Sequence, residues 1–275
     1  MQVQDGDLMR SKPQTLKYFF LSLVGLLLFT KYGVGEIIEI PPIPDNISKK
    51  VKPSVINYEV TYHLENRSFK AYNTREISQT QIDGKNAWHV SKKSEGSWGT
   101  SFYLYDLDLI TLLPLKCEIA TTSKMATLEY TGNNIQGTIT GREGEVALDL
   151  KLDGPVLADD VALDLFIENL PLTPEYEAKL RVFDIQQEEV KQVSLKVVGS
   201  ENITIGSNTI ETFKVELKSL TNNKDINIYH ISKGETRKVI SRKYVYLLSS
   251  GTQIPVTQKM TYKTIDDYWD ENATQ

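Results

Sequence analysis

Three pairs of neighbouring carboxylates are the residues of this sequence best suited to acid–base chemistry. They are Asp106 and Asp108, Asp159 and Asp160, and Asp266 and Asp267. Two carboxylates on either side of one bond can hydrolyse a glycoside, one as the acid and the other as base or nucleophile. We interpret the second pair as a helix cap and the third as part of a polar tail. A carboxylate-dependent hydrolase is therefore kept as an alternative, and no catalytic residue is assigned.

The three histidines and the single cysteine form no metal or nucleophile motif. His63, His89 and His230 fall in separate stretches, at none of the spacings HxH, HxxxH or HExxH. Cys117 lies in a strand-like stretch with no base near it in sequence, so we expect a buried, inert thiol. The glycines at 141 and 144 indicate a tight turn, because no helix follows them as in a phosphate-binding loop. We expect no metal, no cofactor and no nucleotide.

Aromatic side chains suggest a different chemistry, the binding of an apolar ligand. They gather in the first half of the chain, above all in SWGTSFYLYDLDL (97–109). A curved sheet lined with rings can hold a lipid, although the same rings can instead fill a core. For a ligand cavity, the expected lining residues are Tyr58, Tyr62, Trp88 and Phe166.

A run of basic residues between 233 and 243 is a further candidate surface. Its cations are Lys233, Arg237, Lys238, Arg242 and Lys243. Such a run can bind an anionic head group or an acidic partner, or it can be the solvated face of a strand. The interleaved Glu235 favours the solvated face.

The elements that must position these residues are mainly β-strands. From residue 55 onward apolar and polar residues alternate, as in INYEVTYH (56–63), VALDLKLD (146–153) and VSLKVV (193–198). This alternation indicates antiparallel sheets with one buried and one solvated face, and it predicts roughly ten to twelve strands. The segment LADDVALDLFIENLPL (157–172) breaks the pattern. Its apolar spacing predicts one short helix near 159–170 that covers the open side of a curved sheet.

The first 35 residues have the layout of a secretory signal peptide. Three cations precede an apolar run at 18–29, and small residues follow it up to Gly35, where cleavage is expected. We therefore expect export to the periplasm. The alternative is a protein anchored in the membrane by an uncleaved 18–29 segment, although this run is shorter than the 20 or so residues that usually span a bilayer.

The remaining sequence predicts one domain. After the signal peptide (1–35) come a Pro-rich extended linker (36–54), a single β-domain (55–263) and a polar tail (264–275). The 275-residue chain carries a net charge of −5, which becomes −7 once residues 1–35 are removed. This acidic balance argues against nucleic-acid binding, and we expect no stable membrane span after cleavage.

Five stretches resemble the bacterial exported family known as domain of unknown function 3108. They are INYEVTY, DLDLITLLPLKCEI, LFIENLPL, VVGSENITIGSNTIETFKVEL and YHISKGETRKVISRKYVY. The resemblance covers residues 55–262. It implies a periplasmic protein with a curved antiparallel sheet or partly open barrel and a helix plug, similar to lipoprotein carriers. It implies no activity.

These features predict a mainly-β exported protein that binds, without catalysis, an apolar or lipid-like ligand of the cell envelope on a curved sheet. The alternative is a structural or protein-interaction module with a filled core, whose partner is another envelope protein. A cavity of several hundred Å³ favours the first interpretation, and a solid interior favours the second.

Overall fold

The computed structural model describes residues 44, 46–221, 225–247 and 251–263, which belong to the compact unit Ile40–Gln275. The predicted signal peptide and polar tail lie outside the described residues. Within them the structure has one α-helix, one 3-10 helix and 15 strands. In chain order the elements are η2 (Ile47–Lys50), β1 (Ser54–Leu64), β2 (Arg67–Ile82), β3 (Lys85–Gly96), β4 (Gly99–Asp108), β5 (Pro114–Ala120), β6 (Met125–Tyr130), β7 (Asn134–Gly141), β8 (Gly144–Lys151), β9 (Leu157–Ala158), α2 (Asp160–Asn169), β10 (Glu177–Asp184), β11 (Glu189–Ile205), β12 (Asn208–Ser219), β13 (Ile226–Ser232), β14 (Val239–Leu247) and β15 (Gln253–Thr261).

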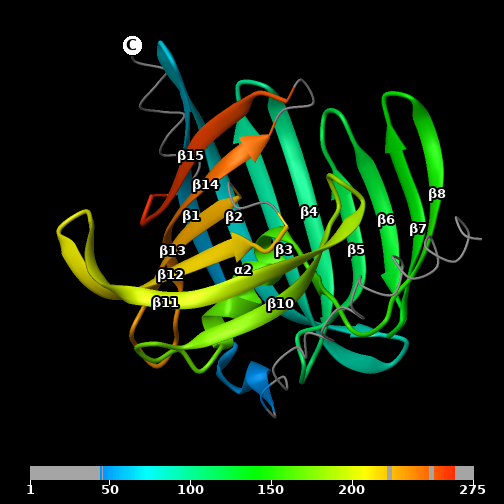
Figure 1. Cartoon of the computed structure of the whole chain (residues 1–275), viewed down its shortest axis with the longest axis horizontal. Coiled ribbons are helices and arrows are strands. Elements are labelled where there is room, and N and C mark those ends of the chain that lie inside the picture. Colours follow the sequence, from blue (N-terminus) through cyan, green and yellow to red (C-terminus); the bar gives the residue numbers. More distant parts are fainter. Residues whose placement is uncertain (1–43, 45, 222–224, 248–250, 264–275) are drawn as a thin grey trace, which may run out of the picture. The chain divides into compact units, whose positions relative to one another are not determined.

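All 15 strands belong to a single sheet, which the chain enters at its middle. β1 lies between β2 and β15, and successive hairpins lead from it to β8 at one edge. The chain then crosses to β9 at the other edge, forms α2, and returns through β10 to β15 beside β1. Neighbouring described strands are antiparallel, except for the short parallel pair β9 and β10. Figure 1 shows the two halves of the sheet on either side of β1.

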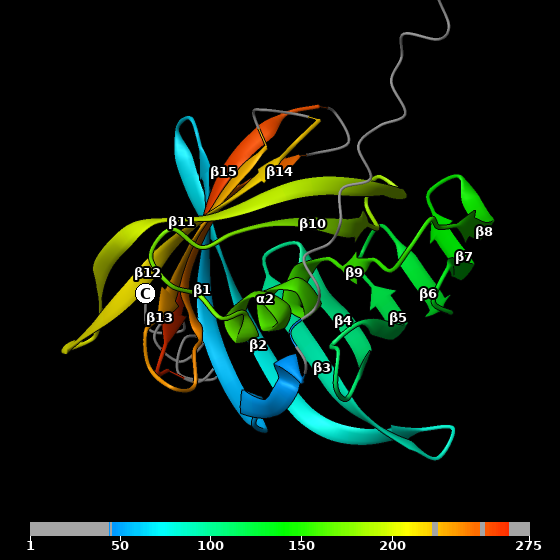
Figure 2. The same ribbon diagram turned by 60° about the horizontal axis from the view of Figure 1, so that its bottom comes forward.

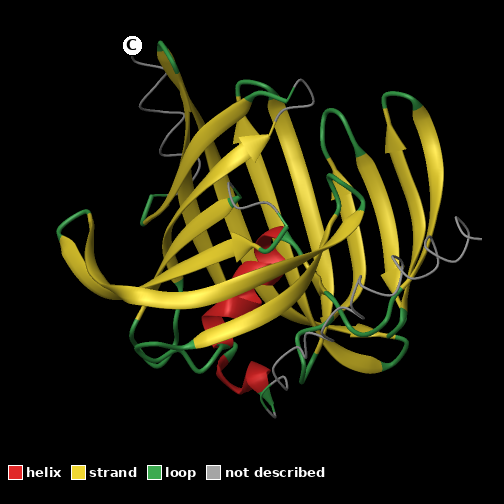
Figure 3. Cartoon of the chain, viewed as in Figure 1, coloured by secondary structure: helices red, strands yellow, loops and turns green. Residues whose placement is uncertain are grey.

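The sheet curves around α2, which lies on its concave face (Figures 2 and 3). Eight of the ten helical residues are buried. The apolar ones belong to one core with residues of strands from β2 to β14. Burying each Leu, Ile or Phe side chain contributes about 1.5–3 kcal/mol, so this contact is a main source of stability. No helix in the described part of the chain has both the length and the apolar character needed to cross a membrane.

The predicted fold class is confirmed: the domain is mainly β, antiparallel and curved, with one helix close to the predicted 159–170. The alternation also places side chains correctly along β1, where Ile56, Tyr58 and Val60 are buried on one face. The strand number was underestimated, with 15 observed in the described residues. Part of the difference is β9, whose two residues are too few to produce an alternation.

The segment before β1 differs from the expected extended linker. Residues 47–50 form η2, and the side chain of Ile47 is buried in the main core. The Ser48 amide also donates a hydrogen bond to the Ile110 carbonyl, at 3.4 Å. The prolines around it suggested a loose chain, but an apolar residue brought close to α2 gains more free energy by packing than by exposure.

β8 is the strand where the predicted buried face is least buried. Its alternating apolar residues were expected inside, yet Val146 is 61% exposed and Leu148 and Leu150 are half-buried. The reason is position: β8 is an edge strand, with β7 as its only neighbour in the described sheet. A local sequence pattern predicts which face of a strand a side chain occupies. It does not predict whether another strand lies beside that strand.

Candidate functional site: the concave face of the sheet

Three carboxylates on α2 face cations of the sheet. Asp160, Asp164 and Glu168 are spaced four residues apart and therefore share one face of the helix. Their partners come from strands that are distant in sequence: Lys92 on β3, Arg242 on β14 and Arg75 on β2. We call these six residues the polar layer. Each carboxylate is matched by one cation, so the layer carries no net charge.

The pair of Arg75 and Glu168 is the most deeply buried part of the polar layer. Arg75 Nη2 donates to Glu168 Oε1 at 2.7 Å, and both side chains are 1% exposed. The backbone amide of Val239 donates to the same oxygen, also at 2.7 Å. Burial opposes charge on Arg75, but the nearby Glu168, Tyr58 and Asp164 together outweigh it and raise the pKa of the guanidinium above its ordinary value. The Arg75 guanidinium is therefore ionised in the folded protein.

Polar atoms remain around this pair that make no hydrogen bond within the described part of the chain. They are the Tyr58 hydroxyl, Asn73 Oδ1, Arg75 Nε and Nη1, and Glu168 Oε2. Tyr58 and Asn73 are opposite each other on β1 and β2, and the Arg75 guanidinium lies 5.9 Å from the centre of the Tyr58 ring. Buried polar groups usually have partners, so this region is suited to polar contacts from water or from a ligand.

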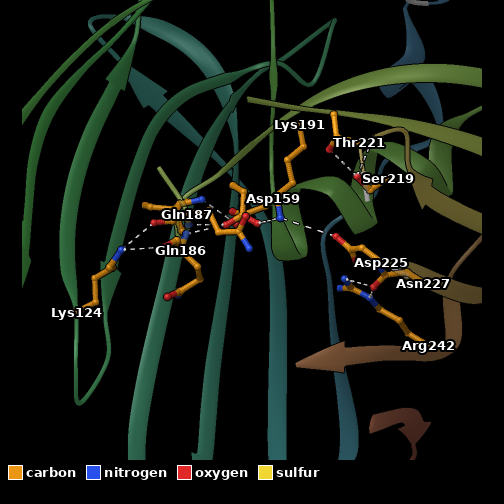
Figure 4. Close-up of polar contacts among 12 residues, drawn as sticks. Lys124, Asp159, Gln186, Gln187, Lys191, Ser219, Thr221, Asp225, Asn227 and Arg242 are labelled. Atoms are coloured by element: carbon orange, nitrogen blue, oxygen red, sulfur yellow. Dashed lines mark hydrogen bonds and ion pairs between the residues drawn. The ribbon is translucent and has the colours of Figure 1, made fainter. Parts of the chain in front are cut away.

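Arg242 contacts both the rest of the polar layer and two aromatic rings. It lies 3.4 Å from Asp164, and its Nε and Nη2 donate to Asn227 Oδ1 (Figure 4). Its guanidinium carbon is 4.9 Å from the ring centre of Tyr229 and 4.6 Å from that of Tyr244. Lys92, the partner of Asp160, lies 3.8 Å from the ring centre of Tyr103.

Five aromatic side chains gather at this part of the concave face. They are Tyr62 on β1, Trp98 in the turn between β3 and β4, Tyr103 on β4, and Tyr244 and Tyr246 on β14. We call them the aromatic cluster. Tyr62 packs edge-on against Trp98 at 4.8 Å and against Tyr246 at 6.1 Å between ring centres. Trp98 and Tyr246 are 40% and 41% exposed, so the cluster is open to solvent.

A tyrosine on one strand raises the pKa of a tyrosine on a strand far from it in the sheet. Burial raises the pKa of Tyr103, and Asp160 and Tyr246 raise it further. Tyr103 and Tyr246 belong to β4 and β14, which four strands separate in the sheet. Burial likewise raises the pKa of Tyr62, with Tyr244 as a second cause. The hydroxyls of Tyr62 and Tyr103 are therefore neutral at physiological pH and can donate hydrogen bonds.

The four predicted cavity-lining residues are divided between different environments. Trp88 and Phe166 are buried in the main core around α2, and Tyr58 is buried beside Arg75. Tyr62 belongs to the aromatic cluster. Their common role in ligand binding stays a prediction.

Trp98 and Tyr103 lie in the aromatic stretch 97–109 but were not named as lining residues, and Tyr244 and Tyr246 were missed. A signal was present, because tyrosines two residues apart in SFYLY and KYVYL share a face of each strand.

Two surface pockets lie away from the aromatic cluster. One of about 240 Å³ includes Pro114, Leu152 and Val156, and one of about 650 Å³ lies beside the β1–β2 turn at residues 63–67.

The basic run at 233–243 does more than form a solvated strand face: two of its arginines hold α2. Arg237 donates hydrogen bonds to the carbonyl oxygens of Leu170 and Leu172, just after the helix, and Arg242 binds Asp164 within it. Lys238 donates to the Ser54 hydroxyl at 3.2 Å, and Lys233 pairs with Glu211. A local charge pattern does not predict contacts between residues so far apart in the sequence.

Asp159 occupies the N-cap position of α2, but its carboxylate does not cap the helix. Instead it accepts hydrogen bonds from the Tyr105 hydroxyl at 3.1 Å and from the Ile185 amide at 3.3 Å. Figure 4 shows it beside the turn that carries Gln186 and Gln187. Burial, with smaller contributions from Asp160 and Asp184, raises the pKa of Asp159 to about 7.

The remaining candidate acids have structural partners. Asp106 lies 2.7 Å from the His89 ring nitrogen Nδ1, and Asp108 accepts hydrogen bonds from Ile110 and Thr111 in the turn after β4. The pair at 266 and 267 lies outside the described residues. Cys117 is buried, and burial raises the pKa of its thiol far above the ordinary range, as expected for an inert thiol.

The other two histidines also have partners. His63 lies 3.3 Å from the Thr257 hydroxyl, and His230 lies 3.1 Å from Glu201. The described residues contain no group of three or more His, Cys, Asp or Glu side chains placed to hold a metal ion.

Comparison with known proteins identifies the family. The family described as "Protein of unknown function (DUF3108)" matches residues 57–263, which is most of the chain. The chain belongs to the DUF3108 family. This confirms the resemblance inferred from the sequence, and the matched region coincides with the sheet from β1 to β15.

Other comparisons add little about activity. No curated protein matches this DUF3108 chain. A solved structure similar to it is a beta-barrel-like protein of the domain of unknown function DUF1849 from Brucella abortus. It is 9% identical, with a TM-score of 0.40, and the match covers 76% of this chain and 95% of that one.

Proposed function

We propose that this protein is an exported, non-enzymatic binding protein of the cell envelope, and that its aromatic cluster binds the apolar part of a lipid-like ligand. The observation that carries the proposal is the gathering of five aromatic rings on the concave face, two of them about 40% exposed. Aromatic side chains in a solvent-open cluster bury apolar area when a ligand covers them.

The polar layer beneath the rings fits an amphipathic ligand. Lys92 and Arg242 contact both a carboxylate of α2 and a ring of the aromatic cluster, so polar and apolar surfaces meet there. Because the charges of the polar layer balance, recognition depends on apolar contact and hydrogen bonding more than on net charge. Tyrosine hydroxyls supply the hydrogen-bond donors and acceptors.

The packing of α2 against the sheet supports a ligand position outside the helix. Phe166 and Trp88, which were predicted to line a cavity, fill the core between α2 and the sheet. The ligand therefore lies on the aromatic cluster, and α2 closes the interior below it. Export is supported by the basic residues and the apolar run at 18–29, which match a signal peptide.

A fluorescent phospholipid analogue tests the proposal. Fluorescence anisotropy measures its binding to the mature protein, to Trp98→Ala and to Tyr246→Ala. Each substitution removes one ring, worth about 1.5 kcal/mol, and should weaken binding about tenfold. Phe102→Ala is the matched control, because Phe102 is 44% exposed but points from β4 to the other face of the sheet. Equal affinity for all four proteins would refute the proposed site.

The interaction module remains a second candidate, and the solid packing between α2 and the sheet favours it. Its partner would be another protein of the envelope. A protein that binds no lipid analogue but is isolated from its own periplasm in a stoichiometric complex with a second protein would support this function instead.

A further inference from the structure

The two edges of the sheet are built differently. One edge is β9, only two residues long, and both Leu157 and Ala158 are buried. The other is β8, an eight-residue strand with no neighbour on its outer side among the described residues. An exposed strand edge offers a row of backbone hydrogen-bond groups to another strand, and proteins normally shorten or cover such edges. β9 pairs with Val182 and Phe183 of β10, whereas β8 has no partner at any residue on its outer side within the described part of the chain.

The concave-face side chains of β8 are only partly covered, because no described strand lies on their outer side. Val146 is 61% exposed, and Leu148 and Leu150 are half-buried, although all three continue the apolar face of the sheet. A further antiparallel strand beside β8 would cover them and would pair the free backbone groups. The same addition would leave the convex face polar.

We propose that β8 pairs with β8 of a second copy of this chain, in an antiparallel arrangement with its two-fold axis at Leu148. Leu148 then faces its own counterpart, and Val146 faces Leu150. On the convex face Glu145 lies opposite Lys151 of the second copy, and the symmetry makes this charge pair twice. Either type of antiparallel residue pair can occupy the central position.

Among the registers that pair at least five residues of β8, the charges favour this one. A register shifted by one residue would place apolar side chains opposite solvated ones, because neighbouring residues of a strand point to opposite faces. With the axis at Ala147, Glu145 would face Asp149. With the axis at Asp149, this residue would face itself, and Glu145 would face Asp153. Like charges directly opposite each other destabilise a strand pair.

Lys151 is available for the proposed contact. Its side chain is exposed and makes no hydrogen bond or ion pair with another residue of the described part of the chain. Such a dimer is closed, because the pairing uses the open edge of both copies and the opposite edge is buried. One strand pair is a small interface, so we expect a dimer that dissociates on dilution.

A disulfide cross-link tests the register. Leu148→Cys places two thiols opposite each other at the axis, so mild oxidation should give a covalent dimer. Met125→Cys is the control, since Met125 is 59% exposed on β6, away from the edge. The native Cys117 is buried and does not interfere. The absence of a cross-link at 148, or equal cross-linking at 125, would overturn the proposal.

Charge exchange tests the pairing without cysteine. By sedimentation analysis, Glu145→Lys and Lys151→Glu should each weaken dimerisation about tenfold, because each creates two like-charge pairs. The double variant should restore it. A protein that is monomeric at all concentrations would contradict the proposal, as would a double variant no better than the single ones.

Hydrogen exchange identifies any other occupant of this edge. The β8 amides should become more protected as the protein concentration rises. Protection that does not depend on concentration would mean that a segment of the same chain covers the edge, which would refute pairing between copies.

Discussion

At the scale of single residues, the concave face is organised by ion pairs between α2 and the sheet. Arg75 and Glu168 are both about 1% exposed, and Val239 adds a backbone hydrogen bond to the same carboxylate. A buried pair of this kind contributes little net free energy, but removing one partner leaves an uncompensated charge. The pair therefore specifies where α2 lies more than it stabilises the fold.

Arg75→Met should lower the free energy of unfolding by about 3–5 kcal/mol, because Glu168 is then buried with only the Val239 amide as a partner. The double variant Arg75→Met/Glu168→Gln should recover part of this loss, since the introduced amide carries no charge and can still accept that hydrogen bond. Urea denaturation measures both. A loss below about 1 kcal/mol for the single variant would show that the pair is not buried as described.

Asp159 should make stability depend on pH. Its pKa rises from 3.8 to about 7 on folding, mainly through burial. Between these values the folded state holds a proton that the unfolded state has lost. The stabilisation from the protonated carboxyl is therefore complete below pH 3.8 and is lost as the pH rises through 7.

Asp159→Asn removes this titration. From about pH 4 to pH 8, the unfolding free energy of the natural protein should fall relative to that of Asp159→Asn by about 4 kcal/mol. Denaturation curves of the two proteins at several pH values measure the difference. A constant difference over this range would contradict the buried, protonated state of Asp159.

At the scale of elements, α2 is held at both ends as well as along its polar face. Asp159 connects its start to the β10–β11 turn and to β4, and Arg237 binds the carbonyl groups that follow its end. A ten-residue helix is marginal by itself in water. Its position therefore depends on these contacts and on the apolar side chains that it buries.

Arg237→Ala should loosen the end of α2. Two charge-assisted hydrogen bonds are lost, so we expect a destabilisation of about 2–4 kcal/mol and faster amide exchange in the last turn of the helix. Lys233→Ala is the control from the same segment. It removes the more exposed pair with Glu211 and a contact with the Phe213 ring, which Arg237 also makes, and should change stability by less than about 1 kcal/mol. Equal effects of the two substitutions would contradict the role of Arg237.

The elements were predictable from the sequence to the extent that they depend on local pattern. Alternation along residues 56–63 identified the buried face of β1, and apolar spacing identified α2. The exposure of Val146 and the helix contacts of Arg237 were not predictable in this way. Both depend on which distant strand or helix lies beside the residue, and a single sequence does not encode that as a local signal.

At the scale of the whole domain, the topology decides where a ligand can bind. The chain enters the sheet at β1 and returns beside it at β15, so β4 and β14 lie in opposite halves of the sheet. Tyr62 of β1 packs against Trp98 after β3 and against Tyr246 of β14. α2 occupies the space between the halves, and Phe166 fills the core there. The predicted aromatic lining is thus divided, and the solvent-open aromatic cluster beyond the helix is the surface left for a ligand.

Native mass spectrometry of the protein purified from the cells that naturally produce it tests this account most directly. We expect a bound lipid-like molecule in the natural protein and in Phe102→Ala, and its loss from the double variant Trp98→Ala/Tyr246→Ala. A natural protein with no adduct, or an adduct that the double variant retains at the same level, would contradict a ligand site on the aromatic cluster.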